Sequence, residues 1–353
     1  MRRYASGELR LLNRMAISPH LRQTDLAKDL GVTRSAVNQI WTKLESECGL
    51  RVKSKIDYAS LGLRHIAGWV SDSEMSQALE KFNNWLESNP FIISSQESVM
   101  TSGMDHRVLF EILAPEGRHL SHITRQLERF TKRPYSLTVN YDLVRHESVH
   151  FNLGLFDGDK WDFEGGFRLG ATISAAKDYA DVLPSYTSES IDRSQHFDFV
   201  DIMIALSLGN DYHLSSSDIM NFASKLGYSA PSGRTLRRKI NRIRESIASP
   251  YLSVQNIGLS TPFTLCLKRR DKDNLPRLMH AQAESLPKSR VLSGNKFVVM
   301  LLEIPESIEW VALSQIFSEM VGLSTNMCTF IAQNYPRSLE IEKLLIRLMS
   351  SIP

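Results

Sequence analysis

Cysteine is scarce in this sequence, and its scarcity excludes two kinds of framework. The three cysteines, Cys48, Cys266 and Cys328, lie far apart along the chain. A disulfide scaffold or a structural zinc site needs closely spaced cysteines, so the sequence predicts neither. We expect reduced thiols in a cytoplasmic protein, with no metal site and no cofactor.

Long apolar runs and an excess of one charge are lacking as well. The longest purely apolar run, Phe297–Leu302, is far shorter than the roughly 20 residues of a membrane-spanning helix. The Met-Arg-Arg start is followed by polar residues, so we expect neither a signal peptide nor a membrane partner. Lysine and arginine (42) barely outnumber aspartate and glutamate (39), so only local charge can indicate a nucleic-acid partner.

The stretch Gln23–Leu44 has the pattern of a helix-turn-helix. Apolar residues recur at near-helical spacing on both sides of Gly31, which can end the first helix in the left-handed conformation, and Thr33 can cap the second. The second helix of such a motif enters the major groove of DNA. Its candidate DNA-binding residues are Arg34, Ser35, Asn38, Gln39, Thr42 and Lys43. The alternative is a helical hairpin packed inside a larger domain.

The flanking segments complete a winged version of this motif. Glu8–Ala16 has apolar residues on one face and is expected to form the first of three helices. Arg51–Asp57 alternates basic and apolar residues and predicts a short β-wing. Since a wing contacts the phosphate backbone, Arg51, Lys53 and Lys55 are candidate phosphate ligands.

The next segment predicts a ferredoxin-like unit, with the order β-α-β-β-α-β. A Leu-Gly-Leu precedes the first strand, and a Gly103 turn separates the second strand from the third. The expected elements are a strand ending at Val70, a helix over Glu74–Ser88, strands over Phe91–Val99 and Val108–Leu113, a helix over Leu120–Phe130 and a strand over Ser136–Leu143.

A winged helix-turn-helix followed by this unit resembles the Lrp/AsnC family of prokaryotic transcription regulators. The resemblance covers about residues 8–143 and depends on the helix-turn-helix, on Leu61-Gly62-Leu63 and on the turn Ser102–Asp105. It implies a double-stranded DNA partner and ferredoxin-like units that pair through their sheets. It also implies a small effector near that turn, at Thr101, Gly103 and Asp105, and it is compatible with a homodimer.

The second half of the chain is expected to repeat the first. Ser217–Leu226 followed by Gly227 matches the first helix of the helix-turn-helix, and Arg234–Ile247 matches its second helix. A second ferredoxin-like unit should follow. Its expected elements are a strand over Val254–Leu267, a helix over Leu275–Ser285, a strand over Phe297–Ile304, a helix over Trp310–Met320, a strand over Met327–Gln333 and a terminal helix over Leu339–Ser350.

The second recognition helix is far more basic than the first. Between Gly233 and Arg244 there are six basic residues and no acid, which favours contact with a polyanion over a merely solvated face. The candidate DNA-binding residues on it are Arg234, Arg237, Arg238 and Arg242.

Between the halves, Asp157-Gly158-Asp159 predicts a hairpin whose arms are Val149–Phe156 and Trp161–Arg168, followed by a polar linker. The hairpin could extend one sheet or bridge the two units. The expected domains are a winged helix-turn-helix (1–57), a ferredoxin-like domain (58–145), the hairpin and linker (146–196), a second winged helix-turn-helix (197–256) and a second ferredoxin-like domain with a terminal helix (257–353).

The sequence therefore predicts an α+β protein with two winged helix-turn-helix domains and two ferredoxin-like domains in tandem. We interpret it as a DNA-binding transcription regulator, pseudo-dimeric by internal duplication, and not an enzyme. Two alternatives stay open. One is an Lrp-like scaffold with tetrapyrrole or small-molecule enzymatic activity, which stays open because some proteins that resemble this winged-helix plus ferredoxin-like build are tetrapyrrole decarboxylases. The other is a protein-interaction module of the transcription machinery.

Overall fold

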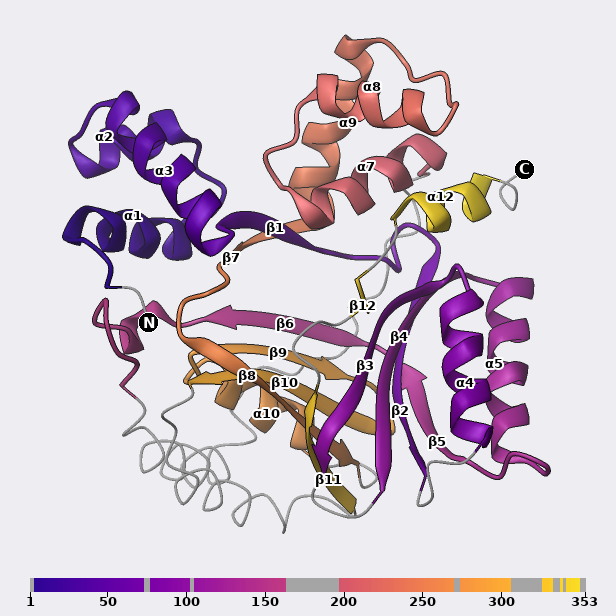
Figure 1. Cartoon of the computed structure of the whole chain (residues 1–353). Helices are drawn as coiled ribbons and strands as arrows, with labels where there is room; N and C mark the ends of the chain where they lie inside the picture. Colours follow the sequence, from indigo (N-terminus) through magenta and orange to yellow (C-terminus); the bar gives the residue numbers. More distant parts are fainter. Residues whose placement is uncertain are drawn as a thin grey trace.

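Two helical units lie above a sheet-based lower half in the computed structural model (Figure 1). The structure describes residues 3–72, 77–101, 105–162, 197–269, 274–305, 326–332, 337–338 and 341–349. The predicted α+β class, with winged-helix and ferredoxin-like units in tandem, is confirmed. Within the described residues, no helix combines the length and apolar character needed to cross a bilayer.

The first helical unit forms as its sequence pattern predicts. It consists of α1 (Ser6–Ile17), α2 (Gln23–Leu30) and α3 (Arg34–Cys48). Gly31 ends α2 with a φ of 66°, a conformation that costs glycine little. The Thr33 hydroxyl accepts the backbone N–H of Ala36 at 3.1 Å and caps α3. Leu26, Val37 and Leu44 pack the helices together.

The second helical unit repeats this arrangement. It consists of α7 (Phe199–Asn210), α8 (Ser216–Lys225) and α9 (Gly233–Ser246). The helix α7 is buried around most of its circumference because it packs against α9, against β1 and against the C-terminal helix α12 (Ile341–Met349). This unit is therefore seated more deeply in the molecule than the first.

The wings of the two units pair with each other. Strand β1 (Arg51–Ile56) runs antiparallel to β7 (Ala248–Ser253), from Arg51 opposite Ser253 to Ile56 opposite Ala248. The wing was predicted as a short strand against DNA, whereas the structure places it in a two-stranded ribbon between the helical units and the large sheet (Figure 1).

Both ferredoxin-like units are present. The first has the strand order β5-β2-β4-β3 and the second has the equivalent order β11-β8-β10-β9. The first comprises β2 (Leu63–Asp72), α4 (Gln77–Ser88), β3 (Ile92–Thr101), β4 (His106–Pro115), α5 (Arg118–Thr131) and β5 (Thr138–Leu143). The second comprises β8 (Leu259–Lys268), α10 (Leu275–Ala283), β9 (Lys288–Ser293), β10 (Phe297–Pro305) and β11 (Asn326–Ala332). The helix expected over Trp310–Met320 and the residues Glu74–Ser76 of the expected first helix lie outside the described residues.

The two units join through their strands and through their sheet faces. Strand β3 pairs with β11, and the two-residue strand β12 (Arg337–Ser338) pairs with β3 as well. The faces that carry no helices pack on each other through a mixed cluster from β2, β4, β8, β9, β10 and β11, in which the Trp69 and Phe297 rings lie 5.4 Å apart. The pairing of the duplicated units within one chain was predicted from the repeat.

The predicted long hairpin is wrong for its first arm. Strand β6 (His146–Phe151) pairs with β9 of the second unit, followed by the short 3-10 helix η1 (Leu153–Leu155). Across the turn, Phe156 and Trp161 form an isolated β-bridge, and residues 163–168 of the second arm lie outside the described residues. The segment therefore bridges the units, because β6 follows β5 of the first unit and extends the sheet of the second.

Candidate functional site

A cluster of buried charges lies where β4, β6 and β9 come together. Arg290 on β9 donates two hydrogen bonds to Glu111 on β4, at 2.7 and 2.8 Å, and a third to Glu147 on β6 at 2.6 Å. The His65 Nε2 atom on β2 lies 2.9 Å from the second oxygen of Glu111. We call Arg290, Glu111, Glu147 and His65 the Arg290 cluster; it draws on both halves of the chain.

Electrostatics fix the charge state of this cluster. Burial by itself raises the pKa of Glu111, but Arg290 and His65 outweigh it and hold that pKa well below its usual range. Burial lowers the pKa of Arg290, but the two carboxylates raise it far more, so the net shift is upward. Glu111 is only 1% exposed, so its charge depends on these partners rather than on water.

The ribbon supplies three further polar side chains beside the cluster. Tyr58 follows β1, and its ring lies 6.0 Å from that of His65. Burial, followed by the charge of Glu147, raises the pKa of Tyr58 above its usual value. Tyr251 on β7 stands opposite Lys53 in the ribbon, and burial raises its pKa to about 12. Both phenols therefore keep their proton at neutral pH.

Lys53 is the cation of this region that lacks a counter-ion. It makes no hydrogen bond or ion pair with any residue that the structure describes. Burial, followed by the positive charges of Lys288 and Arg51, lowers its pKa. The neighbouring Lys288 is different, because it bonds Glu303 at 2.6 Å and the Val254 carbonyl at 3.2 Å. An unpaired ammonium among other cations is suited to bind a carboxylate or another anion.

A second group of side chains, centred on His280 and His146, lies between β6 and α10. The His280 ring is 0% exposed and contacts the hydroxyls of Ser148 at 2.6 Å and Ser293 at 3.0 Å. The His146 ring lies 4.6 Å from it. Burial and neighbouring cationic groups lower the pKa of His146 to about 4 and that of His280 to about 3. Across the described ranges, no three His, Cys, Asp or Glu side chains are grouped to hold a metal ion.

The predicted DNA-binding residues of α3 lie on its outer face. All six are exposed, and of these side chains only that of Lys43 has a partner among the described residues, Glu8 at 2.9 Å. The six are Arg34, Ser35, Asn38, Gln39, Thr42 and Lys43.

On α9 the basic residues divide into two groups. Arg234, Arg237 and Arg238 are exposed. Arg242 instead lies 2.7 Å from Asp201 and stacks over the Phe197 ring. Lys239 also bonds Asp201, at 3.0 Å, and Arg244 donates to the carbonyls of Tyr212 and Leu214. Part of the basic run is thus neutralised within its own unit.

Three of the predicted wing and effector residues, Lys55, Asp105 and Thr101, have contacts within the chain. The Lys55 ammonium donates to the Glu147 carbonyl at 3.1 Å, and Lys53 lies beside the cluster. Asp105 accepts two hydrogen bonds from Arg107, at 2.6 and 2.9 Å, and Arg107 also donates to the Thr329 carbonyl. Thr101 pairs with Phe330 of β11, whereas Gly103 lies outside the described residues.

Sequence reasoning missed the members of the Arg290 cluster, together with Tyr58 and Tyr251. A signal was available for one member, because Glu111 interrupts the apolar run Val108–Ala114. A charged residue at an inward position of a strand needs a partner. The partners could not be named, since they are far away in the sequence.

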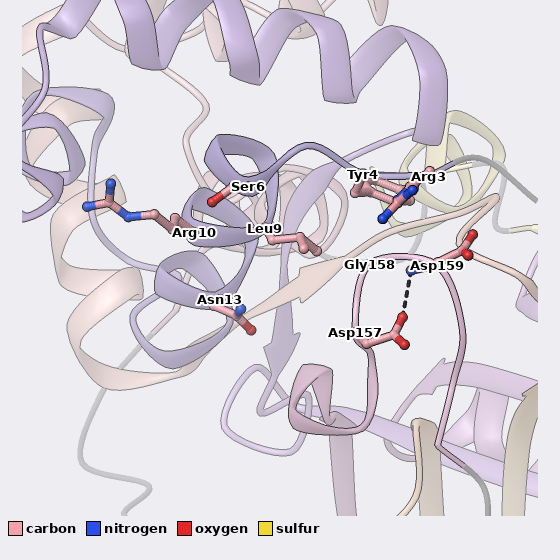
Figure 2. A pocket seen from close by; sticks show the side chains of 9 residues that line it. All are labelled: Arg3, Tyr4, Ser6, Leu9, Arg10, Asn13, Asp157, Gly158 and Asp159. Atoms are coloured by element: carbon pink, nitrogen blue, oxygen red, sulfur yellow. Dashed lines mark hydrogen bonds between the residues drawn. The ribbon is translucent and has the colours of Figure 1, made fainter.

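A separate hollow of about 440 Å³ lies between α1 and the turn at 157–159 (Figure 2). Two of the charged side chains that line it are engaged by the chain itself. Asp157 accepts the backbone N–H groups of Asp159 and Lys160, which lower its pKa, and Arg10 donates to the Leu30 carbonyl. This hollow is therefore a weaker candidate than the Arg290 cluster.

No protein-family model and no curated protein matches the sequence. Among solved structures, the chain is similar to the siroheme decarboxylase NirDL, with a TM-score of 0.52 at 13% identity over 98% of this chain and 99% of that one. It is also similar to NirDL in complex with an iron-uroporphyrin III analogue, with a TM-score of 0.50 at 11% identity and the same coverage. At such identities the likeness concerns the fold.

The comparison corrects one expectation. From the sequence we expect a regulator that is not an enzyme. The same tandem fold, over nearly the full length of both chains, occurs in an enzyme. The inference from winged helices to a non-catalytic regulator is therefore wrong, and neither of these two structural neighbours is a regulator.

Proposed function

We propose that the protein binds a polycarboxylated tetrapyrrole beside the Arg290 cluster and removes one of its carboxylates as CO2. The observation that carries this proposal is the unpaired Lys53 next to a charge network that is otherwise satisfied. The fold shared with a siroheme decarboxylase supports the choice of substrate class.

The roles of the residues follow from their charge. Arg290 is saturated by Glu111 and Glu147, so it organises the site and leaves substrate binding to other groups. Lys53 binds a carboxylate of the substrate. The bound carboxylate attracts the Lys53 ammonium and so offsets the repulsion that Lys288 and Arg51 exert on it. Anion binding should raise the pKa of Lys53 toward its usual value.

The reaction breaks the bond between a side-chain carbon and its carboxylate carbon. CO2 leaves, and the electron pair stays on the side-chain carbon, which must then take up a proton. Tyr58 is protonated at neutral pH and lies beside His65, so it is our candidate for the proton donor. The balance needs one proton and no oxidant.

Binding is tested by titrating the protein with siroheme and with an iron-uroporphyrin III analogue, and visible absorption is the readout. Lys53→Ala should weaken binding about tenfold or more, because it removes a charge-assisted contact. Lys132→Ala, which removes an exposed lysine after α5, is the matched control and should bind like the wild type. Absence of tetrapyrrole binding by the wild type, or equal affinity of both variants, would refute the proposal.

The chemical step has its own test, by mass spectrometry of the tetrapyrrole after incubation. The wild type should give a product that is lighter by one CO2. Tyr58→Phe should lower the rate about 100-fold or more while leaving the affinity unchanged, and Tyr251→Phe is the comparison on the other ribbon strand. A Tyr58→Phe variant with the wild-type rate would remove this residue from the proton transfer.

DNA binding is the second candidate function, and the exposed outer face of α3 favours it. Five of its six predicted residues have side chains with no partner among the described residues, as expected of a face that meets a ligand. We propose that Asn38 and Gln39 would contact base edges and that Arg34 would contact phosphate.

A gel-shift assay with promoter fragments tests this second function. Asn38→Ala combined with Gln39→Ala should reduce discrimination between fragments, whereas Arg234→Ala combined with Arg238→Ala should weaken binding to every fragment alike. Binding that neither double variant alters would refute DNA recognition by these helices.

A further inference from the structure

The two helical units enclose a cleft that the proposed decarboxylation does not use. Its volume is about 1030 Å³, and it is lined by residues of α2 and α3 of the first unit, of α8 and α9 of the second, and of the start of β1. Five arginines line it. Arg244 on α9 is half-buried, whereas the other four are exposed: Arg22 just before α2, Arg34 on α3, Arg51 on β1 and Arg237 on α9. We call it the inter-helix cleft.

These four arginines differ from the other basic residues nearby. All four are exposed, and none makes a hydrogen bond or ion pair with another residue in the described part of the chain. Lys239, Arg242 and Arg244 on α9, in contrast, are all held by partners in the second unit. Lys239 and Arg242 thus have Asp201 as a counter-ion and Arg244 has carbonyl partners, whereas the four exposed arginines of the cleft have neither within the described residues.

The cleft carries more positive than negative side chains. Burial lowers the pKa of His213 and of Arg244, which both line it; the charge of Arg22 adds to this shift, and that of Asp211 opposes it. Two acids, Glu45 and Asp211, line the cleft as well, but Asp211 already accepts the backbone N–H of His213 at 2.8 Å. The balance of unpaired charge is positive.

Backbone donors add to this charge. The first residues of α2, Gln23 and Thr24, line the cleft, and no side chain caps this helix. The free N–H groups and the positive end of the helix dipole at such a terminus suit a phosphate group. Hydroxyl groups of Thr42, Ser46 and Ser216 supply further hydrogen-bonding partners.

The size of the cleft limits its ligand. A sphere of this volume is about 12 Å across, so the cleft suits a small ligand and is too narrow for a DNA duplex. The buried Trp41 offers little surface for a base to stack on, so the anionic groups of a ligand must provide most of the binding energy.

We propose that the inter-helix cleft binds a small phosphorylated polyanion of the nucleoside di- or triphosphate class, held by Arg22, Arg34, Arg51 and Arg237. Such a ligand would contact both helical units at once and so fix their relative position. The site is distinct from the Arg290 cluster, and either proposal can fail without the other.

Isothermal titration calorimetry of the full chain with ATP and with inorganic pyrophosphate tests the proposal, with citrate as a carboxylate of similar charge. The cleft variant combines Arg34→Ala with Arg237→Ala. Its matched control combines Arg234→Ala with Arg238→Ala, which removes equal charge from the recognition helices outside the cleft. We expect the cleft variant to lose about tenfold or more in affinity for each arginine and the control to lose little.

Thermal unfolding of the same proteins shows whether the variants fold. Because all four substituted side chains are exposed and unpaired within the described residues, both variants should melt close to the wild type without ligand, and ATP should raise the melting temperature of the wild type and the control only. The proposal is overturned if the phosphates do not bind, if both variants lose affinity equally, or if citrate binds as tightly as pyrophosphate. It is also overturned if single-stranded DNA binds through the cleft arginines and the small phosphates do not.

Discussion

At the scale of single residues, Glu111 is the carboxylate that matters most for the Arg290 cluster. It is 1% exposed and accepts two hydrogen bonds from Arg290 while contacting His65. Glu111→Gln would leave Arg290 with Glu147 as its only described carboxylate. Breaking a buried pair costs about 3–5 kcal/mol, so we expect a loss near the lower end of that range, measured by urea unfolding.

A second glutamate provides the control for this prediction. Glu303 pairs with Lys288 at 2.6 Å, but its side chain is 40% exposed. Glu303→Gln should therefore cost about 1 kcal/mol or less. Equal losses for the two variants would show that the Arg290 cluster contributes no more than a surface ion pair.

The sequence correctly predicted those features that depend only on residues close together in the chain. The Gly31 turn and the Thr33 cap follow from which residues can adopt a positive φ or accept an N–H group, and both are present. The Arg290 cluster could not be found in this way. Arg290 and Glu111 are 179 residues apart, and only the pairing of two units brings them together.

At the scale of elements, the ribbon of β1 and β7 shows that alternation of polar and apolar residues predicts a strand but not the strand with which it pairs. The alternation of Arg51–Ile56 correctly predicted a strand. It did not identify the partner, because β7 contains Pro250 and has no regular alternation of its own. The candidate phosphate ligands of the wing consequently lie against the large sheet or the inter-helix cleft.

The strands β8 and β11 carry a cysteine pair that yields a second prediction. Cys266 and Cys328 lie directly opposite each other in the antiparallel register. Opposite residues have Cα atoms about 4.5–5.5 Å apart, which is within the range of a disulfide. The hydrogen bond from Cys266 lowers the pKa of Cys328, so its thiolate forms more readily.

We therefore expect a mild thiol oxidant such as diamide to link Cys266 to Cys328, detected as a linked peptide pair after digestion without reduction. Cys328→Ser should abolish the link. Cys48 is buried and donates its hydrogen bond to the Leu44 carbonyl, so it serves as the internal control and should stay reduced. Two free thiols at Cys266 and Cys328 after such treatment would contradict the register.

At the scale of the whole molecule, duplication explains the architecture but not the function. The repeated order of elements predicted both halves and their pairing. It did not predict β6, which ties the first unit to the sheet of the second. We interpreted the protein as a regulator from its recognition helices. Local charge shows where an anion can bind, but it does not show which anion.

The joint formed by β6 should make the molecule sensitive to acid. His146, His150 and His280 lie at this joint, between β6 and α10, with Lys55 as a neighbouring cation and Glu147 and Glu284 as acids. Their usual pKa is 6.5, whereas in the fold those of His146 and His280 fall to about 4 and about 3, chiefly through burial. Between these values the unfolded chain binds more protons than the folded one. The free energy of unfolding therefore has its highest value, as far as these histidines determine it, above about pH 6.5, and it falls as the pH drops toward 4.

Urea unfolding at a series of pH values from about 7.5 to about 4.5 should show this loss. Each pKa unit is worth about 1.4 kcal/mol, so the fully buried His280 accounts for roughly 3–5 kcal/mol when its whole window is crossed. His280→Gln can still bond Ser148 or Ser293 but takes up no proton, so its stability should depend less steeply on pH. His122→Gln on the exposed face of α5 is the surface control. If His280→Gln lost stability with the wild-type slope, proton uptake at this joint would not be the cause of acid sensitivity.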